Sequence, residues 1–466
     1  MTRRRGPRLQ WIFPWFLLAG PVLAAGCAAS LPDVKMIVES SLSRQRPPEI
    51  VDAQGRLSPA ESRQVLAGIR KRVESEEILE RHAAVMELVD ASPLVKDNRA
   101  TLLIDGPRTY DAIFRAIGNA RDHVHVETYI IRDDEIGRKL GDALLRKRAE
   151  GVPVRLLYDS YGCIKTPESF FQRLRDGGVQ VLEFNPVDPL QAGGNWRLIH
   201  RDHRKILVAD GKLAITGGVN VSAEYAGSLR GSGSAESWRD TDVQIEGPAV
   251  AEFQKLFLDT WRRQKGPALP EGNYFPDLAG KPMGDDLVRV VGSRPAGGTR
   301  LTYIMYVSAF LYARKSIHLT NAYFVPDKQT IEALTGAAKR GVDVRIILPG
   351  DTDVSTILYA GRYYYTRLLE AGVKLYEHRS AVLHAKTAVI DGVWSTVGSA
   401  NMDMWSFTRN DEVNAVILGR EFAGQMEEMF ARDLSESDAV DLEKWRKRPI
   451  FHRIREWFGH LVRYWL

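Results

Sequence analysis

Residues 203–210 read HRKILVAD, and residues 384–391 read HAKTAVID, so one short pattern occurs twice in the chain. Both copies contain a histidine, a lysine two positions later and an aspartate five positions after the lysine. Each copy continues to a glycine and an asparagine, always 181 positions apart between copies: Gly217 and Asn220, then Gly398 and Asn401. A duplicated domain explains this repeat better than chance does.

The spacing of the histidines and lysines predicts two anion sites. Because side chains two positions apart on a β-strand project from the same face, His203 can lie beside Lys205, and His384 beside Lys386. An imidazole next to an ammonium group suits a phosphate.

The two aspartates mark the turns that follow. Asp210 and Asp391 each precede a glycine, and Asp-Gly pairs are typical of tight hairpin turns. The returning strands then bring Asn220 and Asn401 back toward the histidines. An aspartate at such a position commonly caps backbone amides, which favours a structural role over a catalytic one.

Weaker matches surround both motifs and predict the fold class. The offset stays between 181 and 194 residues for three more pairs: 124–126 with 317–319, 150–157 with 340–347, and 178–181 with 372–375. These are helix ends followed by β-rich runs. Strands alternating with helices predict two α/β domains, and the Pro- and Gly-rich stretch 266–284 is the expected linker.

The N-terminal segment has the features of an export signal. Four arginines in the first eight residues precede the apolar run Leu9–Ala25, which is short for a membrane span and is interrupted by two prolines. The run ends LAAGC at 23–27, which resembles a bacterial lipobox with Cys27 as the lipidated residue. We expect a lipid anchor on the periplasmic side of the outer or inner membrane. An uncleaved inner-membrane signal anchor is the alternative.

The charge balance does not favour nucleic acid as a partner. Lys and Arg number 64 and Asp and Glu 59, and four of the basic residues lie in the export-like segment. The rest of the chain therefore has a net charge of +1. Nucleic acid-binding domains usually carry a strongly basic surface, so no nucleic acid partner is expected.

The double motif resembles the signature of the phospholipase D superfamily, and the resemblance covers the chain from about Asn98 to its C-terminus. It implies an α/β fold of two phospholipase D-like domains, each a mixed β-sheet flanked by helices. A pseudo-twofold axis would relate the domains, with the active site at their interface. The expected divisions are a signal peptide and lipobox (1–27), a helical extension (28–97), the two domains (98–275 and 285–440) and a C-terminal helix (441–466).

The same resemblance implies roles for the motif residues. By family convention His203 is the nucleophile that forms a phosphohistidine, and His384 is the general acid and then the base. Lysines and asparagines would stabilise charge on the phosphate oxygens without a metal or any other cofactor. The implied catalytic set within the motifs is His203, Lys205, Asp210, Asn220, His384, Lys386, Asp391 and Asn401.

A nucleophilic imidazole also needs an acceptor on its second nitrogen, and the family places a carboxylate downstream of each motif. Glu412 fits this place and lies seven residues before Gly419. Counting back seven residues from Gly247 gives Asp240 as its counterpart. His200, three residues before His203, is equally compatible with headgroup contact and with packing at the strand entry.

Further segments resemble bacterial cardiolipin synthases in particular: 127–131, 134–137, 238–240 with 245–248, and 323–327. This resemblance implies phosphatidyl transfer between two phosphatidylglycerol molecules, giving cardiolipin and glycerol. A phospholipase D that releases phosphatidic acid is the alternative, followed by a secreted phosphodiesterase or nuclease. A lipid-binding scaffold without activity is disfavoured because both histidines and both lysines are present.

The C-terminal segment 441–466 is expected to form an amphipathic basic helix. Apolar residues recur there at helical spacing from Ile450 to Trp465, with arginines between them. Such a helix is typical of a membrane interface, but the same stripe can pack on a domain core. A membrane surface is therefore an expected partner, with core packing left open.

Overall fold

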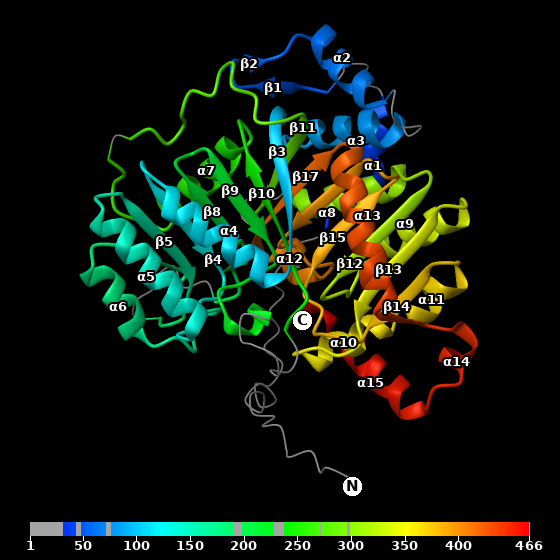
Figure 1. Cartoon of the computed structure of the whole chain (residues 1–466). Helices are drawn as coiled ribbons and strands as arrows, with labels where there is room; N and C mark the ends of the chain where they lie inside the picture. The colour runs from blue at the N-terminus through cyan, green and yellow to red at the C-terminus, as the bar shows by residue number, and fades with distance from the viewer. Residues whose placement is uncertain are drawn as a thin grey trace. The chain divides into compact units, whose positions relative to one another are not determined.

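Two mixed β-sheets with the same strand order form the body of the protein (Figure 1). The computed structural model describes residues 31–42, 48–70, 76–189, 198–227, 237–270, 272–295 and 299–465. The predicted signal peptide and the predicted lipidation site Cys27 lie outside these residues. Among the described residues, no helix combines the length and apolarity needed to span a bilayer.

The first sheet is built from residues on both sides of the first motif. Its three parallel strands are followed by antiparallel ones. In spatial order they are β6 (Gln180–Phe184), β5 (Val154–Asp159), β4 (Val124–Thr128), β8 (Ile206–Ala209), β9 (Leu213–Gly217), β10 (Thr241–Glu246) and β3 (Leu94–Ile104).

The second sheet repeats this order strand by strand. It again has three parallel strands and then antiparallel ones. They are β14 (Lys374–His378), β13 (Asp343–Pro349), β12 (Ser316–Asn321), β15 (Lys386–Ile390), β16 (Trp394–Gly398), β17 (Asn410–Leu418) and β11 (Asp286–Ser293). The two halves are therefore related by the pseudo-symmetry that the repeated motif predicts.

Helices connect and cover the strands in equivalent positions. The first half contains α4 (Asp105–Asn119), α5 (Glu135–Ala149), α6 (Glu168–Asp176), η1 (Ala223–Tyr225) and α7 (Val250–Arg263). The second contains α8 (Leu301–Tyr312), α9 (Lys328–Lys339), α10 (Ser355–Arg362), α11 (Tyr365–Glu370), α12 (Met404–Thr408) and α13 (Arg420–Ser435). Asp134 and Asp327 cap the matching helices α5 and α9 by accepting hydrogen bonds from first-turn amides.

Strand β3 joins the two sheets. Its first residues pair with β11, as in the match of Val95 with Val288, and its last residues pair with β10, as in the match of Ile104 with Thr241. The predicted domain boundary at residue 98 therefore falls within this strand. Apolar side chains from both sheets, including Val243 and Val413, share one buried core between the halves.

The N-terminal extension is not helical throughout. It contains α1 (Val34–Leu42), α2 (Pro59–Arg70) and α3 (Glu76–Leu88), but also the hairpin strands β1 (Ile50–Asp52) and β2 (Gly55–Arg56), and β1 pairs with β3. The side chain of Asp52 accepts hydrogen bonds from the amides of Gln54 and Gly55, and Gly55 has a φ of 129°. Strands of two or three residues are too short to show the alternating pattern that predicts a strand.

Two short strands and the C-terminal helices complete the described chain. Strand β7 (Arg201–Asp202) precedes His203, and β18 (Ser437–Ala439) pairs with β14. The segment predicted as one C-terminal helix forms α14 (Leu442–Arg446), α15 (Ile450–Leu461) and the 3-10 turn η4 (Arg463–Trp465). Pro449 immediately precedes α15, at a position where proline is compatible with the start of a helix.

Candidate active site

The backbone of β7 places His203 beside a carboxylate from the other half. β7 pairs in parallel with β17, matching Asp202 with Asp411, and the amide of His203 donates to the Asp411 carbonyl over 2.9 Å. The imidazole Nδ1 lies 3.1 Å from both carboxylate oxygens of Glu412. Ser399 also donates a hydrogen bond to Glu412, so the carboxylate is held in place. With Nδ1 engaged, Nε2 is the nitrogen left for chemistry.

His384 has the same arrangement with the halves exchanged. Arg239 forms a parallel bridge with Leu383, and the amide of His384 donates to the Arg239 carbonyl over 2.8 Å. Nδ1 of His384 lies 2.7 Å from a carboxylate oxygen of Asp240. Each half thus provides one histidine, and it also provides the carboxylate that orients the histidine of the other half.

Both motif lysines are buried next to the histidine of their own strand. Nζ of Lys205 donates to the His203 carbonyl over 2.6 Å, and Nζ of Lys386 donates to the His384 carbonyl. Burial lowers the pKa of Lys205 to about 7 and that of Lys386 to about 8. Two buried ammonium groups at one interface form a strong attraction for an anion, and binding an anion favours their protonated form.

Aromatic side chains line the same place, and the motif did not predict them. The ring of Tyr129 lies 4.9 Å from that of His203, and Tyr323 lies 6.0 Å from His384, measured between centroids. Each tyrosine ring also lies near the lysine of its own half, Lys205 at 5.3 Å and Lys386 at 6.0 Å. Tyr129 follows β4 by one residue and Tyr323 follows β12 by two, so the two tyrosines are one position apart in the repeat. Inspection of the segments after equivalent strands could have found them.

Both motif asparagines are buried, and Asn220 lies at the interface of the halves. Nδ2 of Asn220 donates to the hydroxyl of Tyr225 over 3.0 Å, and that hydroxyl lies 3.2 Å from Nδ1 of His384. Asn401 follows β16 and is 4% exposed, with its backbone amide bonded to Ser406. Asn220 from the first half is therefore connected to the histidine of the second half.

Asp210 and Asp391 do not join this cluster. Each has a positive φ, 55° and 54°, in the turn after the motif strand. The carboxylate of Asp210 accepts from the amides of Arg121, Asp122 and His123, and that of Asp391 accepts from the amides of Arg314, Lys315 and Ser316. The placement of both in the catalytic set is corrected by this geometry, because each carboxylate is bonded to a backbone turn at the far end of its strand.

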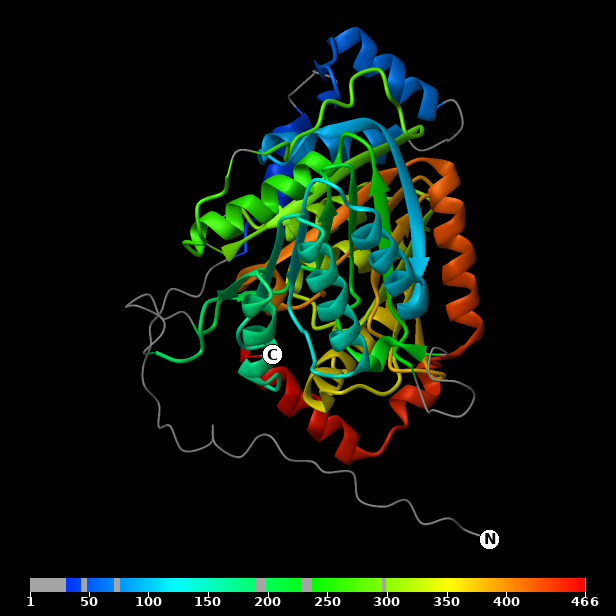
Figure 2. The same cartoon turned by 60° about the vertical axis from the view of Figure 1, so that its left-hand side comes forward.

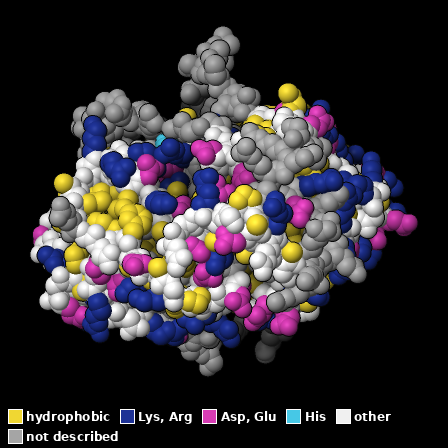
Figure 3. All heavy atoms as spheres, turned by 90° about the horizontal axis from the view of Figure 1, so that it is seen from above, with side chains coloured by type: hydrophobic (Ala, Val, Ile, Leu, Met, Phe, Trp, Pro, Cys, Tyr) yellow, Lys and Arg dark blue, Asp and Glu magenta, His cyan; other side chains and the backbone are white. Residues whose placement is uncertain are grey.

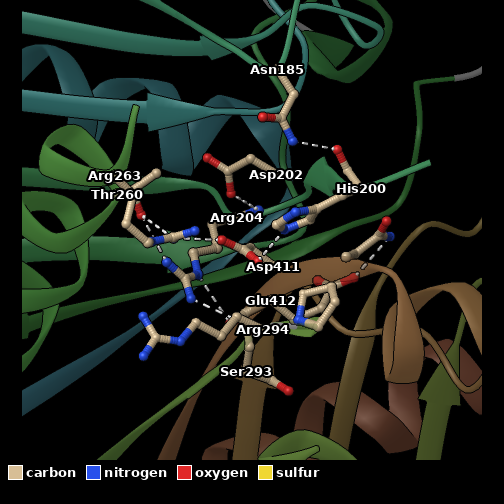
Figure 4. Close-up of polar contacts among 12 residues, drawn as sticks. Asn185, His200, Asp202, Arg204, Thr260, Arg263, Ser293, Arg294, Asp411 and Glu412 are labelled. Atoms are coloured by element: carbon tan, nitrogen blue, oxygen red, sulfur yellow. Dashed lines mark hydrogen bonds and ion pairs between the residues drawn. The ribbon is translucent and has the colours of Figure 1, made fainter. Parts of the chain in front are cut away.

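A network of charged residues contacts Asp411, which precedes Glu412 in the chain (Figure 4). Nε2 of His200 lies 2.7 Å from one oxygen of Asp411, and Arg263 donates to the other over 2.7 Å. This contact gives His200 a structural partner within the protein. Burial acts to raise the pKa of Asp411, but the positive charges of Arg204, His200 and Arg263 lower it overall.

Arg204, the middle residue of the first motif, crosses between the halves. Its guanidinium donates to the Glu412 carbonyl over 3.2 Å and to Ser293 over 3.1 Å, both in the second half, and to Thr260 over 3.0 Å in the first. The motif pattern gives no sign of this role, because the equivalent residue in the second copy is Ala385.

Burial sets the protonation of the central dyads. It lowers the pKa of His203 and, more strongly, that of His384, while it raises the pKa of Asp240 to about 6. Burial acts to raise the pKa of Glu412 as well, but His203 and its hydrogen bond lower it overall. A neutral imidazole beside an ionised carboxylate can act as a nucleophile, and a second imidazole can carry a proton.

The chain is similar to known proteins over most of its length. The family model described as "Cardiolipin synthase, PLD-like domain" matches residues 113–261 and 306–434. A cardiolipin synthase of Alkalihalophilus pseudofirmus is 36% identical over 80% of this chain and 73% of its own length. Cardiolipin synthase 2 of Bacillus anthracis is 37% identical over 76% of this chain and 68% of its own.

A solved structure confirms the fold. The crystal structure of phosphatidylserine synthase from Haemophilus influenzae matches 79% of this chain and 95% of that chain, with a TM-score of 0.61 and 15% sequence identity. At this identity the likeness concerns the fold alone. Together with the two matched regions of the family model, it confirms the predicted pair of similar α/β domains.

Proposed function

We propose, since the chain belongs to the cardiolipin synthase family of phospholipase D-like proteins, that it transfers a phosphatidyl group between two phosphatidylglycerol molecules. The products are cardiolipin and glycerol. The observation that carries the proposal is the reciprocal pairing of His203 with Glu412 and of His384 with Asp240 across the interface. Two oriented imidazoles facing one site are what a two-step transfer through a covalent intermediate needs.

In the first step, Nε2 of His203 attacks the phosphorus of the donor lipid. The N–P bond forms while the bond from phosphorus to the glycerol headgroup oxygen breaks. His384, whose protonated form is favoured by the bound phosphate anion, gives that oxygen its proton. Glycerol leaves, and a phosphatidyl-histidine remains. Glu412 supports the reaction because it stabilises the positive charge that develops on the His203 ring.

In the second step, a hydroxyl of another phosphatidylglycerol attacks the same phosphorus. His384, now neutral, takes the proton of that hydroxyl, the new O–P bond forms and the N–P bond to His203 breaks. Cardiolipin leaves and both histidines return to their starting states. One phosphodiester is exchanged for another, so the reaction needs no energy-rich nucleotide.

Lys205 and Lys386 stabilise the negative charge on the phosphate oxygens in both steps. Both ammonium groups are at most 5% exposed, and charges act more strongly where water is excluded. The side-chain amide of Asn220 supplies a neutral polar group at the interface, and the buried Asn401 is its counterpart in the second motif. In this scheme the chain's own residues perform every proton and group transfer.

Water in place of the second lipid would make the protein a phospholipase D that releases phosphatidic acid. The geometry serves either acceptor equally. A nuclease is less favoured, because the chain without its first segment is close to neutral. On the face of the protein away from α15, basic and acidic side chains are interspersed (Figure 3).

The place of action belongs to the same proposal. The N-terminal sequence supports export and a lipid on Cys27, which would hold the enzyme at a membrane surface where its substrates lie. Labelling cells with a radioactive fatty acid tests this. Label retained on the wild type and absent from the Cys27→Ala variant is expected, and equal label on both would overturn the anchor.

The activity itself is tested with purified protein and labelled phosphatidylglycerol in mixed micelles containing EDTA. Cardiolipin and glycerol are expected from the wild type, and neither from His203→Ala or His384→Ala. Phosphatidic acid as the sole product would replace transfer by hydrolysis. No lipid product from a folded wild-type protein would overturn the proposal.

A further inference from the structure

Helix α15 has its apolar side turned away from the protein. A surface helix normally buries its apolar stripe against the core. In α15 the residues that are buried are Glu456 and Gly459. Six large apolar side chains are instead between 50% and 67% exposed: Ile450, Phe451, Ile454, Trp457, Phe458 and Leu461.

Specific contacts fix this orientation of α15. Gly459 packs against α10 so closely that a Cβ added to it would lie 2.7 Å from the backbone nitrogen of Ala360. Glu456 forms two hydrogen bonds with Arg448, at 2.8 Å and 2.6 Å. The ring of His460 stacks on that of Tyr363 with centroids 3.8 Å apart. The small and polar side of the helix is therefore the side that packs on the protein.

Two arginines border the exposed stripe. At about 100° per residue, Arg453 and Arg455 lie on opposite flanks of the line through Ile454 and Phe458. Arg455 stacks 4.2 Å over the ring of Phe451 and donates to the Tyr359 hydroxyl of α10 over 3.0 Å. An apolar stripe with basic borders fits a layer whose surface is anionic and whose interior is apolar.

Helix α10, on which α15 packs, is connected to the candidate active site. α10 starts two residues after Asp353, whose carboxylate accepts a hydrogen bond of 2.7 Å from the Tyr323 hydroxyl beside His384. At the other end of α15, η4 contacts α12, which starts three residues after Asn401. Figures 1 and 2 show α15 at the same end of the protein as α10.

The first half presents apolar side chains at the equivalent edge. Tyr161 and Ile164, in the segment after β5, are 45% and 62% exposed. The carboxylate of Asp159 ties this segment to the motif, because it accepts from the amides of both Tyr161 and Asp202. β5 and β13 are equivalent strands, so Tyr161 and Ile164 follow β5 where, in the second half, α10 follows β13 and α15 packs on α10.

We propose that the outer face of α15 inserts into the headgroup layer of an anionic phospholipid membrane and holds the active site against it. This inference rests on the proposed function for its purpose, since the lipid substrates would then reach the histidines without leaving the layer. The insertion itself does not depend on turnover, so the two can fail separately.

Insertion is measured at Trp457 in the full chain carrying His203→Ala, which prevents turnover. Vesicles of phosphatidylglycerol and phosphatidylcholine contain lipids brominated near the headgroup. Tryptophan fluorescence should be quenched, and the quenched fraction should fall when Trp457→Phe is added. Equal quenching with and without Trp457 would overturn the proposal, even if the N-terminal anchor keeps the protein on the vesicles.

The consequence for catalysis is measured in the otherwise wild-type chain with the double substitution Ile454→Ser and Phe458→Ser. Turnover on vesicles should fall at least roughly tenfold, because two inserting side chains are lost, while turnover of a short-chain phosphatidylglycerol below its micelle concentration should not change. Met36→Ser removes a similarly exposed apolar side chain in α1 and should change neither rate.

Other outcomes are decisive as well. Equal loss on both substrates would mean that the stripe stabilises the fold, and a dimer that the double substitution dissociates would mean that a second copy covers α15. Either result overturns membrane insertion. Quenching at Trp457 in a protein that makes no lipid product would uphold insertion and reject the proposed function.

Discussion

The imidazole Nδ1 of His203 lies 3.1 Å from each carboxylate oxygen of Glu412, although 209 positions separate these residues in the chain. Asp240 and His384 repeat the contact at 2.7 Å with the halves exchanged. Neither half therefore contains a complete dyad. The apolar core shared by both sheets is what brings each histidine to its carboxylate.

Replacing either carboxylate should reduce transfer with little loss of folding. Glu412→Gln keeps the shape of the side chain but removes the charge that stabilises a positively charged His203 ring, and Asp240→Asn does the same for His384. We expect a fall in kcat of roughly 10²- to 10⁴-fold for each, as for the loss of an orienting carboxylate in other catalytic groups. Steady-state assays with labelled phosphatidylglycerol measure the effect.

The double variant of these carboxylates tests whether the dyads act as one unit. If they do, the combined loss should be well below the product of the two single losses. Thermal unfolding of all three variants is the control for folding. A single variant that is folded and retains full kcat would show that its contact is structural.

Arg204 should be a main source of stability at the interface between the halves. Its removal leaves the buried carboxylate of Glu127, 3.7 Å away, without this partner, and leaves the carbonyls of Ser293 and Glu412 without this donor. Breaking a buried ion pair typically costs about 3–5 kcal/mol, so Arg204→Met should lower the free energy of unfolding by that order.

Arg294→Ala is the matched control for Arg204. Arg294 lies close by in Figure 4, but its side chain is 44% exposed and bonds to the partly exposed Asp259. An exposed pair contributes about 0–1 kcal/mol. Urea unfolding of both variants should therefore separate them by several kcal/mol. Similar midpoints and slopes for the two would contradict a special role for Arg204.

The duplicated motif made the sheets and the histidine dyads predictable. Because Gly247 and Gly419 lie at equivalent strand ends, counting back from them led to Asp240 and Glu412. The pairing of each carboxylate with the histidine of the opposite half was not predicted and is seen only in the structure. Local sequence patterns describe one strand at a time and do not specify contacts between residues 209 positions apart.

Local sequence patterns could not predict the charge network around Asp411 or the orientation of α15. Arg204 and Asp411 belong to charged residue types that are usually exposed, yet both are buried. In α15 the apolar stripe was equally compatible with a core and with a membrane. The deciding feature is Gly459, whose missing side chain lets the opposite face approach α10.

Asp210 and Asp391 should behave as turn residues and not as catalytic ones. Asp210→Ala removes an acceptor shared by three backbone amides, so we expect the free energy of unfolding to fall by about 1–2 kcal/mol while kcat of the folded protein stays within roughly threefold. Asp210→Asn should lose less, because asparagine tolerates a positive φ and still accepts a hydrogen bond. A large fall in kcat at unchanged stability would return Asp210 to the catalytic set.

The pH dependence of transfer should reflect the two buried lysines. Burial lowers the pKa of Lys205 to about 7 and of Lys386 to about 8, so both lose their charge as the pH rises through these values in the free enzyme. kcat/KM, which reports groups of the free enzyme, should therefore show a fall between about pH 7 and 8. This fall adds to one at lower pH from the loss of the His384 proton, because burial lowers the pKa of that imidazole as well. On the acid side, burial lowers the pKa of His203, so the nucleophile should stay neutral to below the ordinary histidine range.

Lys205→Arg assigns the alkaline fall to a side chain. A guanidinium keeps its charge throughout this pH range, so the pH profile of the variant should no longer contain the alkaline fall that belongs to Lys205. The absolute activity of the variant should be lower, because a guanidinium differs in shape from an ammonium group. Short-chain phosphatidylglycerol below its micelle concentration keeps membrane binding out of the measurement. If wild type and Lys205→Arg decline along the same alkaline curve, the charge of Lys205 does not control the reaction, and Lys386 or His384 must account for the decline.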